Sequence, residues 1–240
     1  MVMPLYDDNP FRLPHRPIVT WSLIGVNFLV FLLSGGQSGE AAYYFGLTPA
    51  ALHGDVSLDG GVAPALTLVS YMFLHADIVH ILSNMVFLWV FGDNVEEAMG
   101  RLRFLAFYLL CGIIGALAFF ATDVHSRTPL IGASGAIAGV VVAYAMLRPC
   151  AKVTALVFGI PMRISAYWII GVFVFMQFIN LAAASASDVA YWCHVGGMAA
   201  ALVLFPLMRL PGVVLFECIR APKPPVVAEA SVVPGPWSTR

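Results

Sequence analysis

The sequence predicts an all-α membrane protein, a bundle of six transmembrane helices with both termini in the cytoplasm. Three observations lead to this fold class. The chain of 240 residues is 60% hydrophobic and 10% charged, and its mean hydropathy is +0.89, whereas soluble domains are about 25% charged. Six apolar segments are long enough to cross a bilayer. Lys and Arg gather on one side of these segments.

A spanning helix needs about 20 mostly apolar residues. The segments that meet this need are 17–35, 78–98, 101–122, 129–148, 164–181 and 189–209. We interpret the first as an uncleaved signal-anchor helix, because two aspartates and three prolines precede it. Residues 62–76 are apolar but too short to span, so we interpret them as an interfacial or re-entrant part of the first loop.

The basic residues predict the orientation. Eleven Lys and Arg lie in the N-terminal segment, in the loops after the second and fourth spans and in the C-terminal tail, and only Arg127 lies on the other side. The positive-inside rule then makes both termini cytoplasmic. We divide the chain into a cytoplasmic N-terminal segment (1–16), a membrane domain (17–210) and a Pro-rich, disordered cytoplasmic tail (211–240).

Net charge and cysteine content exclude other classes of protein. The formal net charge of −1 carries no nucleic-acid signal. The cysteines form neither a CxxC pair nor a metal spacing. Three of them lie in or beside apolar segments, so we interpret these three as packing residues, and we expect no disulfide framework. The four cysteines are Cys111, Cys150, Cys193 and Cys218.

Polar side chains within spans are costly and mark functional positions. Ser134 lies in the fourth span, His194 in the sixth, and His80 and Asn84 on one face of the second. Counted from the preceding polar or Pro residue, these positions lie roughly 5 to 10 Å into their spans. All three spans enter from the extracytoplasmic side, so the four side chains fall at similar depth.

This set of groups suits acyl transfer. A serine hydroxyl becomes a strong nucleophile when a histidine takes its proton, and His and Asn side chains can donate hydrogen bonds to an oxyanion. No acidic third member is visible beside Ser134 and His194. Gly135 with Gly139, and Gly197 with Ala201, form small-xxx-small pairs that let helices approach closely.

Other readings of the same residues stay open. The serine in IGASGAIAG can be a helix-packing residue, because small-residue stripes also occur in channels and transporters. His75, His80 and His194 can bind zinc, although no carboxylate stands at ligand spacing. Either reading makes the polar set structural or metal-binding instead of catalytic.

Four motifs, in chain order, resemble those of the rhomboid family of intramembrane serine proteases. HILSN is similar to the family's HxxxN motif, GASGA to its GxSG motif and HVGG to its histidine motif. GDNVEEAMG resembles GxxxExxxG, at the cytoplasmic end of the second span, with Gly92, Glu96 and Gly100. The resemblance covers about residues 17–210.

The resemblance implies a six-helix bundle around a water-filled cavity, with a short central span that carries the serine. It implies that Ser134 is the nucleophile and His194 the base, and that His80 and Asn84 stabilise the oxyanion. It also implies transmembrane protein substrates and no metal or organic cofactor. Two glycines, Gly132 and Gly135, would then allow the substrate backbone to approach closely.

The chain departs from the family pattern in two places. Its first loop lacks the Trp–Arg pair of many members, and Ala138 stands where some members have a Tyr that stacks on the base. We therefore expect Tyr191 or Trp192 to orient His194.

We predict a multi-pass protease of the bacterial cell (inner) membrane whose active site opens to the extracytoplasmic side. The alternative is a catalytically inactive rhomboid-like protein that binds membrane helices.

Overall fold

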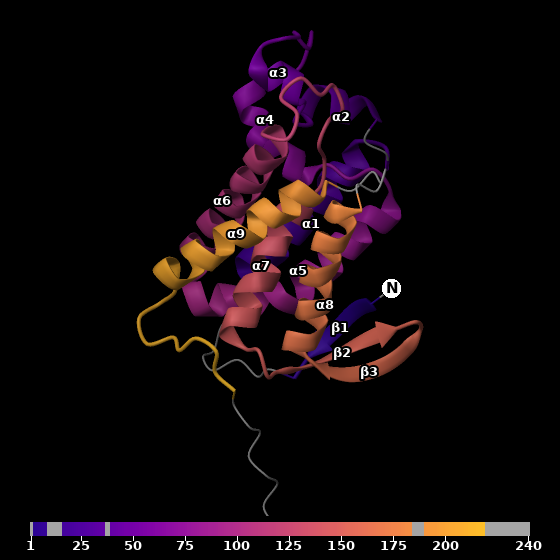
Figure 1. Ribbon diagram of the computed structural model, residues 1–240. Helices are drawn as coiled ribbons and strands as arrows, with labels where there is room; N and C mark the ends of the chain where they lie inside the picture. The colour runs from indigo at the N-terminus through magenta and orange to yellow at the C-terminus, as the bar shows by residue number, and fades with distance from the viewer. Residues whose placement is uncertain (1, 9–15, 37–38, 184–189, 219–240) are drawn as a thin grey trace, which may run out of the picture.

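The computed structural model describes residues 2–8, 16–36, 39–183 and 190–218 (Figure 1). Within these ranges the chain is mostly helical and has one three-stranded antiparallel sheet. The elements are β1 (Val2–Asp7), α1 (Ile18–Leu33), α2 (Gly39–Phe45), α3 (Pro49–His53), α4 (Pro64–Ser70), η1 (Tyr71–Phe73), α5 (Ile78–Met99), α6 (Arg101–Phe120), α7 (Ser134–Leu147), β2 (Lys152–Val157), β3 (Ile160–Ser165), α8 (Ala166–Ala182) and α9 (Tyr191–Met208). Figure 1 shows the short first-loop helices at one end of the bundle and the sheet at the other.

The predicted spans differ in length. Three helices of the described chain, α5, α6 and α9, are long and apolar enough to cross a membrane. The apolar helices α1, α7 and α8 are shorter, with 16, 14 and 17 residues. The described chain is thus a mostly helical membrane protein with three candidate spans.

Helix α7 occupies the centre of the bundle and packs against α5, α6, α8 and α9 (Figure 1). Twelve of its 14 residues are buried. At about 1.5 Å per residue it is only about 21 Å long. Because other helices enclose it, its apolar surface is covered by protein on all sides and its length need not match the bilayer.

Small residues allow the backbone of α7 to lie very close to α6 and α9. A Cβ atom on Gly197 of α9 would stand 2.0 Å from the carbonyl oxygen of Gly135 in α7. A Cβ atom on Gly139 would stand 2.7 Å from Sγ of Cys111 in α6. Only glycine allows this spacing, as the small-residue pattern predicts.

The three residues of the GxxxExxxG motif join α5 to its neighbours. The buried carboxylate of Glu96 accepts hydrogen bonds from the backbone N–H groups of Val19 (3.1 Å) and Thr20 (2.8 Å) and from the Thr20 hydroxyl (2.8 Å). These N–H groups belong to the first turn of α1, so Glu96 caps that helix from outside. A Cβ on Gly92 would stand 3.1 Å from Cγ2 of Thr20, and Gly100 turns the chain into α6 with φ +75°.

Replacing Glu96 by Ala is expected to lower the free energy of unfolding by ~3 kcal/mol or more, because three donors lose a buried charged acceptor. Unfolding in graded denaturing detergent measures this change. The control is Glu40→Ala, because Glu40 lies at an exposed position of α2. Equal stability of the two variants would mean that the cap carries little energy.

The sheet was not predicted from the sequence. Strand β2 pairs antiparallel with both β1 and β3, and a two-residue turn, Phe158–Gly159, joins β2 to β3 with positive φ at both residues. Strand β2 and residues 160–163 of β3 lie in the interval predicted as a loop, and the last two residues of β3 lie at the start of the predicted fifth span. Asp7 anchors β1 to the bundle, since it accepts hydrogen bonds from Tyr144 of α7 (2.6 Å) and Asn94 of α5 (3.1 Å).

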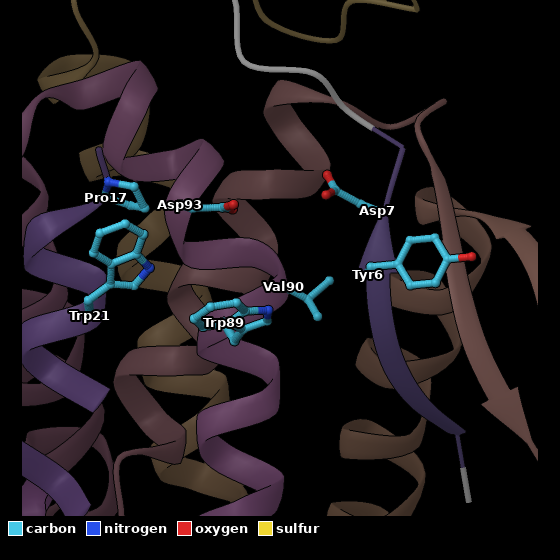
Figure 2. Close-up of a pocket in the computed structure, with 7 residues that line it drawn as sticks. All are labelled: Tyr6, Asp7, Pro17, Trp21, Trp89, Val90 and Asp93. Atoms are coloured by element: carbon cyan, nitrogen blue, oxygen red, sulfur yellow. The ribbon is translucent and has the colours of Figure 1, made fainter. Parts of the chain in front are cut away.

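A cavity of about 380 Å³ lies between β1, α1 and α5 (Figure 2). Trp21 and Trp89 line one side, and the carboxylates of Asp7 and Asp93 face the space between the helices and the strand. It lies at the sheet end of α5, whereas Ile78 begins this helix at the first-loop end.

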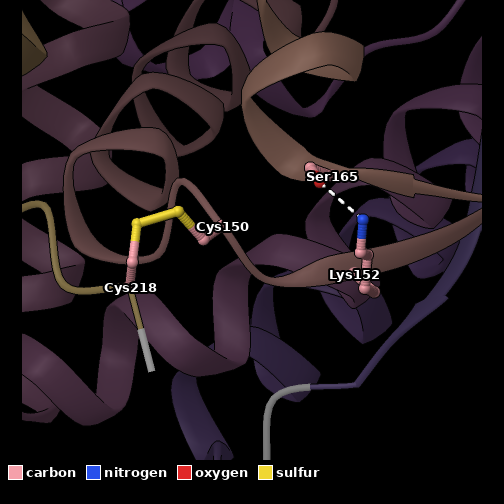
Figure 3. Close-up of a disulfide and its surroundings, with 4 residues drawn as sticks. All are labelled: Cys150, Lys152, Ser165 and Cys218. Atoms are coloured by element: carbon pink, nitrogen blue, oxygen red, sulfur yellow. Dashed lines mark hydrogen bonds between the residues drawn. A yellow bond between two sulfur atoms is a disulfide. The ribbon is translucent and has the colours of Figure 1, made fainter. Parts of the chain in front are cut away.

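The expectation that the cysteines form no disulfide is wrong for one pair. Cys150 and Cys218 form a disulfide, 68 residues apart in sequence, with Cα atoms 5.0 Å apart (Figure 3). Cys111 and Cys193 are free and buried, as expected. Spacing alone could not predict the pair, because the chain after α9 must fold back to bring Cys218 beside the end of α7.

The returning segment makes further contacts beside the disulfide. Arg148 donates to Glu217 at 2.8 Å, and the N–H of Phe216 donates to the carbonyl of Met146 at 2.6 Å. Residues 216–218 thus lie against the C-terminal end of α7. The remainder of the predicted disordered tail, 219–240, lies outside the described residues.

The first loop is tied to the loop between α6 and α7. Leu47 and Leu130 form a pair of backbone hydrogen bonds (3.0 and 2.8 Å), and the N–H of Ala50 donates to the carbonyl of Ser126 (2.9 Å). These backbone contacts connect the two loops although the Trp–Arg pair is missing.

Side chains reinforce this connection. Asp55 accepts from Nδ1 of His53 at 2.9 Å and from Nδ1 of His125 at 2.6 Å. The hydrogen bond with Asp55 and the charge of Asp55 raise the pKa of His125 above 6.5, and hydrogen bonds from His125 and then His53 lower the pKa of Asp55 below 3.8.

The His125–Asp55 pair is expected to tighten the loops between these two pKa values. Its stabilisation is lost as the pH rises through the raised pKa of His125, and again as the pH falls through the lowered pKa of Asp55. An NMR titration in metal-free buffer is expected to give a pKa for His125 above 6.5, which Asp55→Asn returns toward that value. A wild-type pKa of 6.5 or below would contradict the pairing.

Candidate active site

Ser134 stands at the first position of α7. Residues 129–133 are not helical, so the fourth helix begins five residues later than the predicted span 129–148. The cause is Gly132, whose φ of +117° lies outside the helical region, and whose N–H donates to the carbonyl of Tyr71 at 2.9 Å. The loop therefore enters the bundle and presents the hydroxyl at the helix N-terminus.

The structure brings Ser134 and His194 together. Oγ of Ser134 lies 2.8 Å from Nε2 of His194, which is the fourth residue of α9. The imidazole is buried, with 7% of its surface exposed, whereas the serine is partly buried. Gly135 follows Ser134 by one residue, and Gly197 follows His194 by three. The close contact between the backbones of these two glycines sets the distance between Ser134 and His194.

A third side chain completes a hydrogen-bonded series. Nδ1 of His194 lies 2.8 Å from Oε1 of Gln177 in α8, and this amide is itself buried. Since the amide oxygen only accepts, Nδ1 carries the proton and Nε2 offers its lone pair to the serine hydroxyl. Ser134, His194 and Gln177 therefore have the order and polarity of a nucleophile, a base and an orienting group.

The sequence analysis expected Tyr191 or Trp192 to orient the imidazole. The ring of Tyr191 lies edge-on at 6.2 Å from that of His194, and the direct hydrogen-bond partner is Gln177. The available signal was a Gln inside an apolar span, where an amide needs a partner. The sequence could not say which of the polar groups in the fifth span faces the histidine.

His80 approaches the loop that precedes the serine. A Cβ atom on Gly132 would stand 2.8 Å from Nε2 of His80 and 3.8 Å from Oγ of Ser134. The side chains of His80 and Ser134 thus lie beside the backbone of Gly132, which carries no side chain. The N–H of Ala76 lies 3.5 Å from Nδ1 of His80, which favours a proton on Nε2, the nitrogen that faces Gly132.

Asn84 lies one helical turn beyond His80 on α5. It is buried with 7% of its surface exposed, and its Nδ2 makes no hydrogen bond within the described chain. A buried amide donor without a partner costs about 1–3 kcal/mol. Such a donor is suited to a group that is present only during binding or reaction.

The helix N-terminus adds to the polarity of the site. The first N–H groups of α7, beginning at Ser134, have no acceptor within the helix. They carry partial positive charge at the N-terminal end of the helix dipole. Negative charge developing beside the serine is therefore favoured by the backbone itself.

The alternative zinc set of His75, His80 and His194 competes with these contacts. The rings of His75 and His80 lie edge-on with centroids 5.1 Å apart. Both ring nitrogens of His194 are engaged, Nε2 by Ser134 and Nδ1 by Gln177. Zinc at His194 would have to displace one of these partners.

Fold and site together define a helical membrane protein with a serine–histidine pair enclosed among its helices. The family model described as the Rhomboid domain matches residues 63–210. The chain belongs to the rhomboid family, which confirms the resemblance of the motifs.

Curated relatives carry names from the same family. Rhomboid protein 1, mitochondrial, of Saccharomyces cerevisiae is 27% identical over 171 residues, 65% of this chain and 47% of the relative. RHOMBOID-like protein 12, mitochondrial, of Arabidopsis thaliana is 31% identical over 172 residues, 64% of this chain and 50% of the relative. Rhomboid protease GluP of Bacillus subtilis is 34% identical over 128 residues, 52% of this chain and 23% of the relative. The chain thus spans about half the length, or less, of these relatives.

Proposed function

We propose that this chain is an intramembrane serine endopeptidase that cleaves transmembrane segments of other membrane proteins. The observation that carries the proposal is the 2.8 Å contact between Oγ of Ser134 and Nε2 of His194 inside the bundle of a rhomboid-family chain. The name of the relative GluP includes the word protease, which agrees with this assignment.

The proposed reaction has two halves. Nε2 of His194 takes the proton of Ser134 as Oγ attacks the scissile carbonyl, and the same proton passes to the leaving amine when the peptide bond breaks. Water then attacks the acyl-enzyme and gives a proton to His194. When the ester bond to Oγ breaks, His194 returns this proton to Oγ, so that the acid product leaves and Ser134 is regenerated. Gln177 holds the imidazole in the tautomer that both halves require.

The oxyanion of each tetrahedral intermediate is proposed to meet several donors. These are the backbone N–H of Ser134, Nε2–H of His80 and Nδ2 of Asn84, with the N-terminus of α7 adding its partial charge. Gly132 and Gly135 carry no side chain in the path of the substrate backbone. Each donor is worth roughly 10²- to 10³-fold in rate in comparable sites.

The proposed arrangement in the membrane has six spanning helices, α1 and α5 to α9, with both termini in the cytoplasm of a cell whose inner membrane holds the protein. The distribution of eleven basic residues against one supports it. Residues 1–16, 17–210 and 211–240 are then the N-terminal segment, membrane domain and tail. Reporter fusions after residue 240 and within the first loop test this orientation, and a periplasmic C-terminus would contradict it.

Reconstitution tests the proposed activity. Full-length protein in liposomes with single-span substrates, whose transmembrane segments differ in Gly and Ser content, is expected to release fragments cut within or beside the span. Complex formation without cleavage of any substrate would instead support an inactive rhomboid-like protein that binds membrane helices. Ion or solute flux without cleavage would support a channel or transporter.

Gln177→Leu is expected to lower kcat by roughly 10- to 100-fold, because Nδ1–H of His194 loses its acceptor and the ring its orientation. Gln177→Glu keeps an acceptor and is expected to retain more activity. Its added negative charge favours the imidazolium, so the acidic limb of its pH–rate profile moves to higher pH. Parallel kcat and pH profiles check both expectations, and an unaltered profile in both variants would contradict a role for Gln177 in positioning.

A further inference from the structure

Three side chains of the types that commonly bind metals lie together at the end of the bundle opposite the sheet. His53 ends α3, Asp55 follows two residues later, and His125 lies in the loop between α6 and α7. Nδ1 of each histidine faces a different oxygen of the Asp55 carboxylate, at 2.9 Å and 2.6 Å. The three ligand atoms lie within 4.8 Å of one another.

The spacing of ligand atoms in a tetrahedral zinc site falls within this range of distances. With metal–ligand distances of about 2.0–2.2 Å, the ligand atoms of such a site stand roughly 3.3–3.5 Å apart. The two imidazole rings cross edge-on, with centroids 5.0 Å apart and planes at 78°. Both rings direct Nδ1 toward the same carboxylate, and a shift of this carboxylate would make room for an ion between the three side chains.

Hydrogen bonds from the backbone N–H groups hold Asp55 and His125 in place before any ion binds. The N–H of Asp55 donates to the carbonyl of Ala50 at 2.8 Å, and the N–H of His125 donates to the side chain of Asp123 at 3.0 Å. The contact between Ala50 and Ser126 joins the two loops beside the cluster. A preorganised ligand set loses less conformational entropy on binding.

Ion pairing among these three side chains contributes little to the stability of the fold. The side chains of His53, Asp55 and His125 are 45%, 35% and 68% exposed, and exposed ion pairs contribute about 0–1 kcal/mol. Each histidine carries a charge only when protonated, whereas a metal uses the neutral ring. Two imidazoles and one carboxylate are donors that suit Zn²⁺, while Ca²⁺ and Mg²⁺ prefer oxygen ligands throughout.

We propose that His53, Asp55 and His125 form a zinc-binding site that bridges the first loop and the loop leading to Ser134. Water completes the coordination, because the described chain offers three protein ligands. Binding releases any proton held on the Nδ1 atoms, so affinity falls as the pH falls. The site is distinct from Ser134 and His194, and its existence does not depend on the proposed protease activity.

The test is a titration of chelator-treated, full-length protein in nanodiscs with Zn²⁺ alone, followed with a competing zinc dye. One Zn²⁺ per chain is expected, and millimolar Mg²⁺ or Ca²⁺ should not displace it. His53→Ala, Asp55→Asn and His125→Ala are each expected to weaken binding by at least ~10-fold. The matched control is Asp59→Asn, an exposed acid in the same loop, which is expected to bind as the wild type does.

A thermal readout separates this site from binding elsewhere. Zn²⁺ is expected to raise the Tm of the wild type and of Asp59→Asn, but not that of His125→Ala. The proposal is overturned if the wild type binds no stoichiometric Zn²⁺. It is equally overturned if His125→Ala binds as tightly as the wild type, since the ion would then occupy other ligands such as His75 and His80.

Discussion

Ser134→Ala is expected to abolish cleavage of a transmembrane substrate, with a loss in kcat of at least ~10³-fold. The hydroxyl is the only group in the proposed mechanism that bonds to the scissile carbonyl. Its loss leaves the oxyanion donors and His194 in place but no nucleophile beside them. The measurement is fragment release from a single-span substrate in liposomes, at equal protein content.

The loss must come from chemistry and not from misfolding. Ser134 is partly buried, and among the described residues its hydroxyl has one hydrogen-bond partner, His194. We therefore expect the free energy of unfolding of the alanine variant to lie within about 1 kcal/mol of that of the wild type. Undiminished cleavage by a folded Ser134→Ala protein would end the assignment of Ser134 as the nucleophile.

Gly197→Ala is expected to destabilise the bundle and to reduce cleavage by at least ~100-fold. Its new Cβ would stand 2.0 Å from the carbonyl oxygen of Gly135, a backbone atom that cannot rotate away. The helices α7 and α9 must therefore move apart, and Gly135 adjoins Ser134 while Gly197 is three residues from His194. A misplacement of about 1 Å between reacting groups costs roughly 10²-fold in rate, and overpacking costs about 1–3 kcal/mol.

The matched control is Gly171→Ala in α8. No atom of the described part of the chain lies within 4 Å of a Cβ built on Gly171, so the same chemical change meets open space there. Since alanine favours helix over glycine by about 1 kcal/mol, this variant is expected to be as stable as the wild type or slightly more stable. If both variants kept full stability and activity, the close approach of α7 and α9 would not govern the site.

The sequence predicted the apolar helices, because bilayer length and hydropathy leave a strong signal in composition. It also predicted that the Ser134 and His194 side chains meet, since both fall near the start of spans that enter from one side and the glycines let these helices touch. Which polar residue of α8 faces His194 depends on the rotation of that helix. The pattern does not encode this rotation, and Gln177 was therefore missed.

Other features depend on contacts between distant segments. The sheet joins Val2–Asp7 to a hairpin about 150 residues later, and its strands are only six residues long. The Cys150–Cys218 disulfide requires the chain to return along α7. The late start of α7 follows from the positive φ of Gly132, a conformation that a run of small apolar residues does not reveal.

The most direct test of the central claim is covalent labelling of the serine. A fluorophosphonate probe reacts with a serine whose hydroxyl is activated by a neighbouring base, and mass spectrometry locates the modified residue. We expect the probe on Ser134 in the wild-type protein in a bilayer, no label in Ser134→Ala, and much slower labelling in His194→Ala. A folded wild-type protein that leaves Ser134 unlabelled, or reacts equally fast without His194, would contradict a serine activated by this histidine.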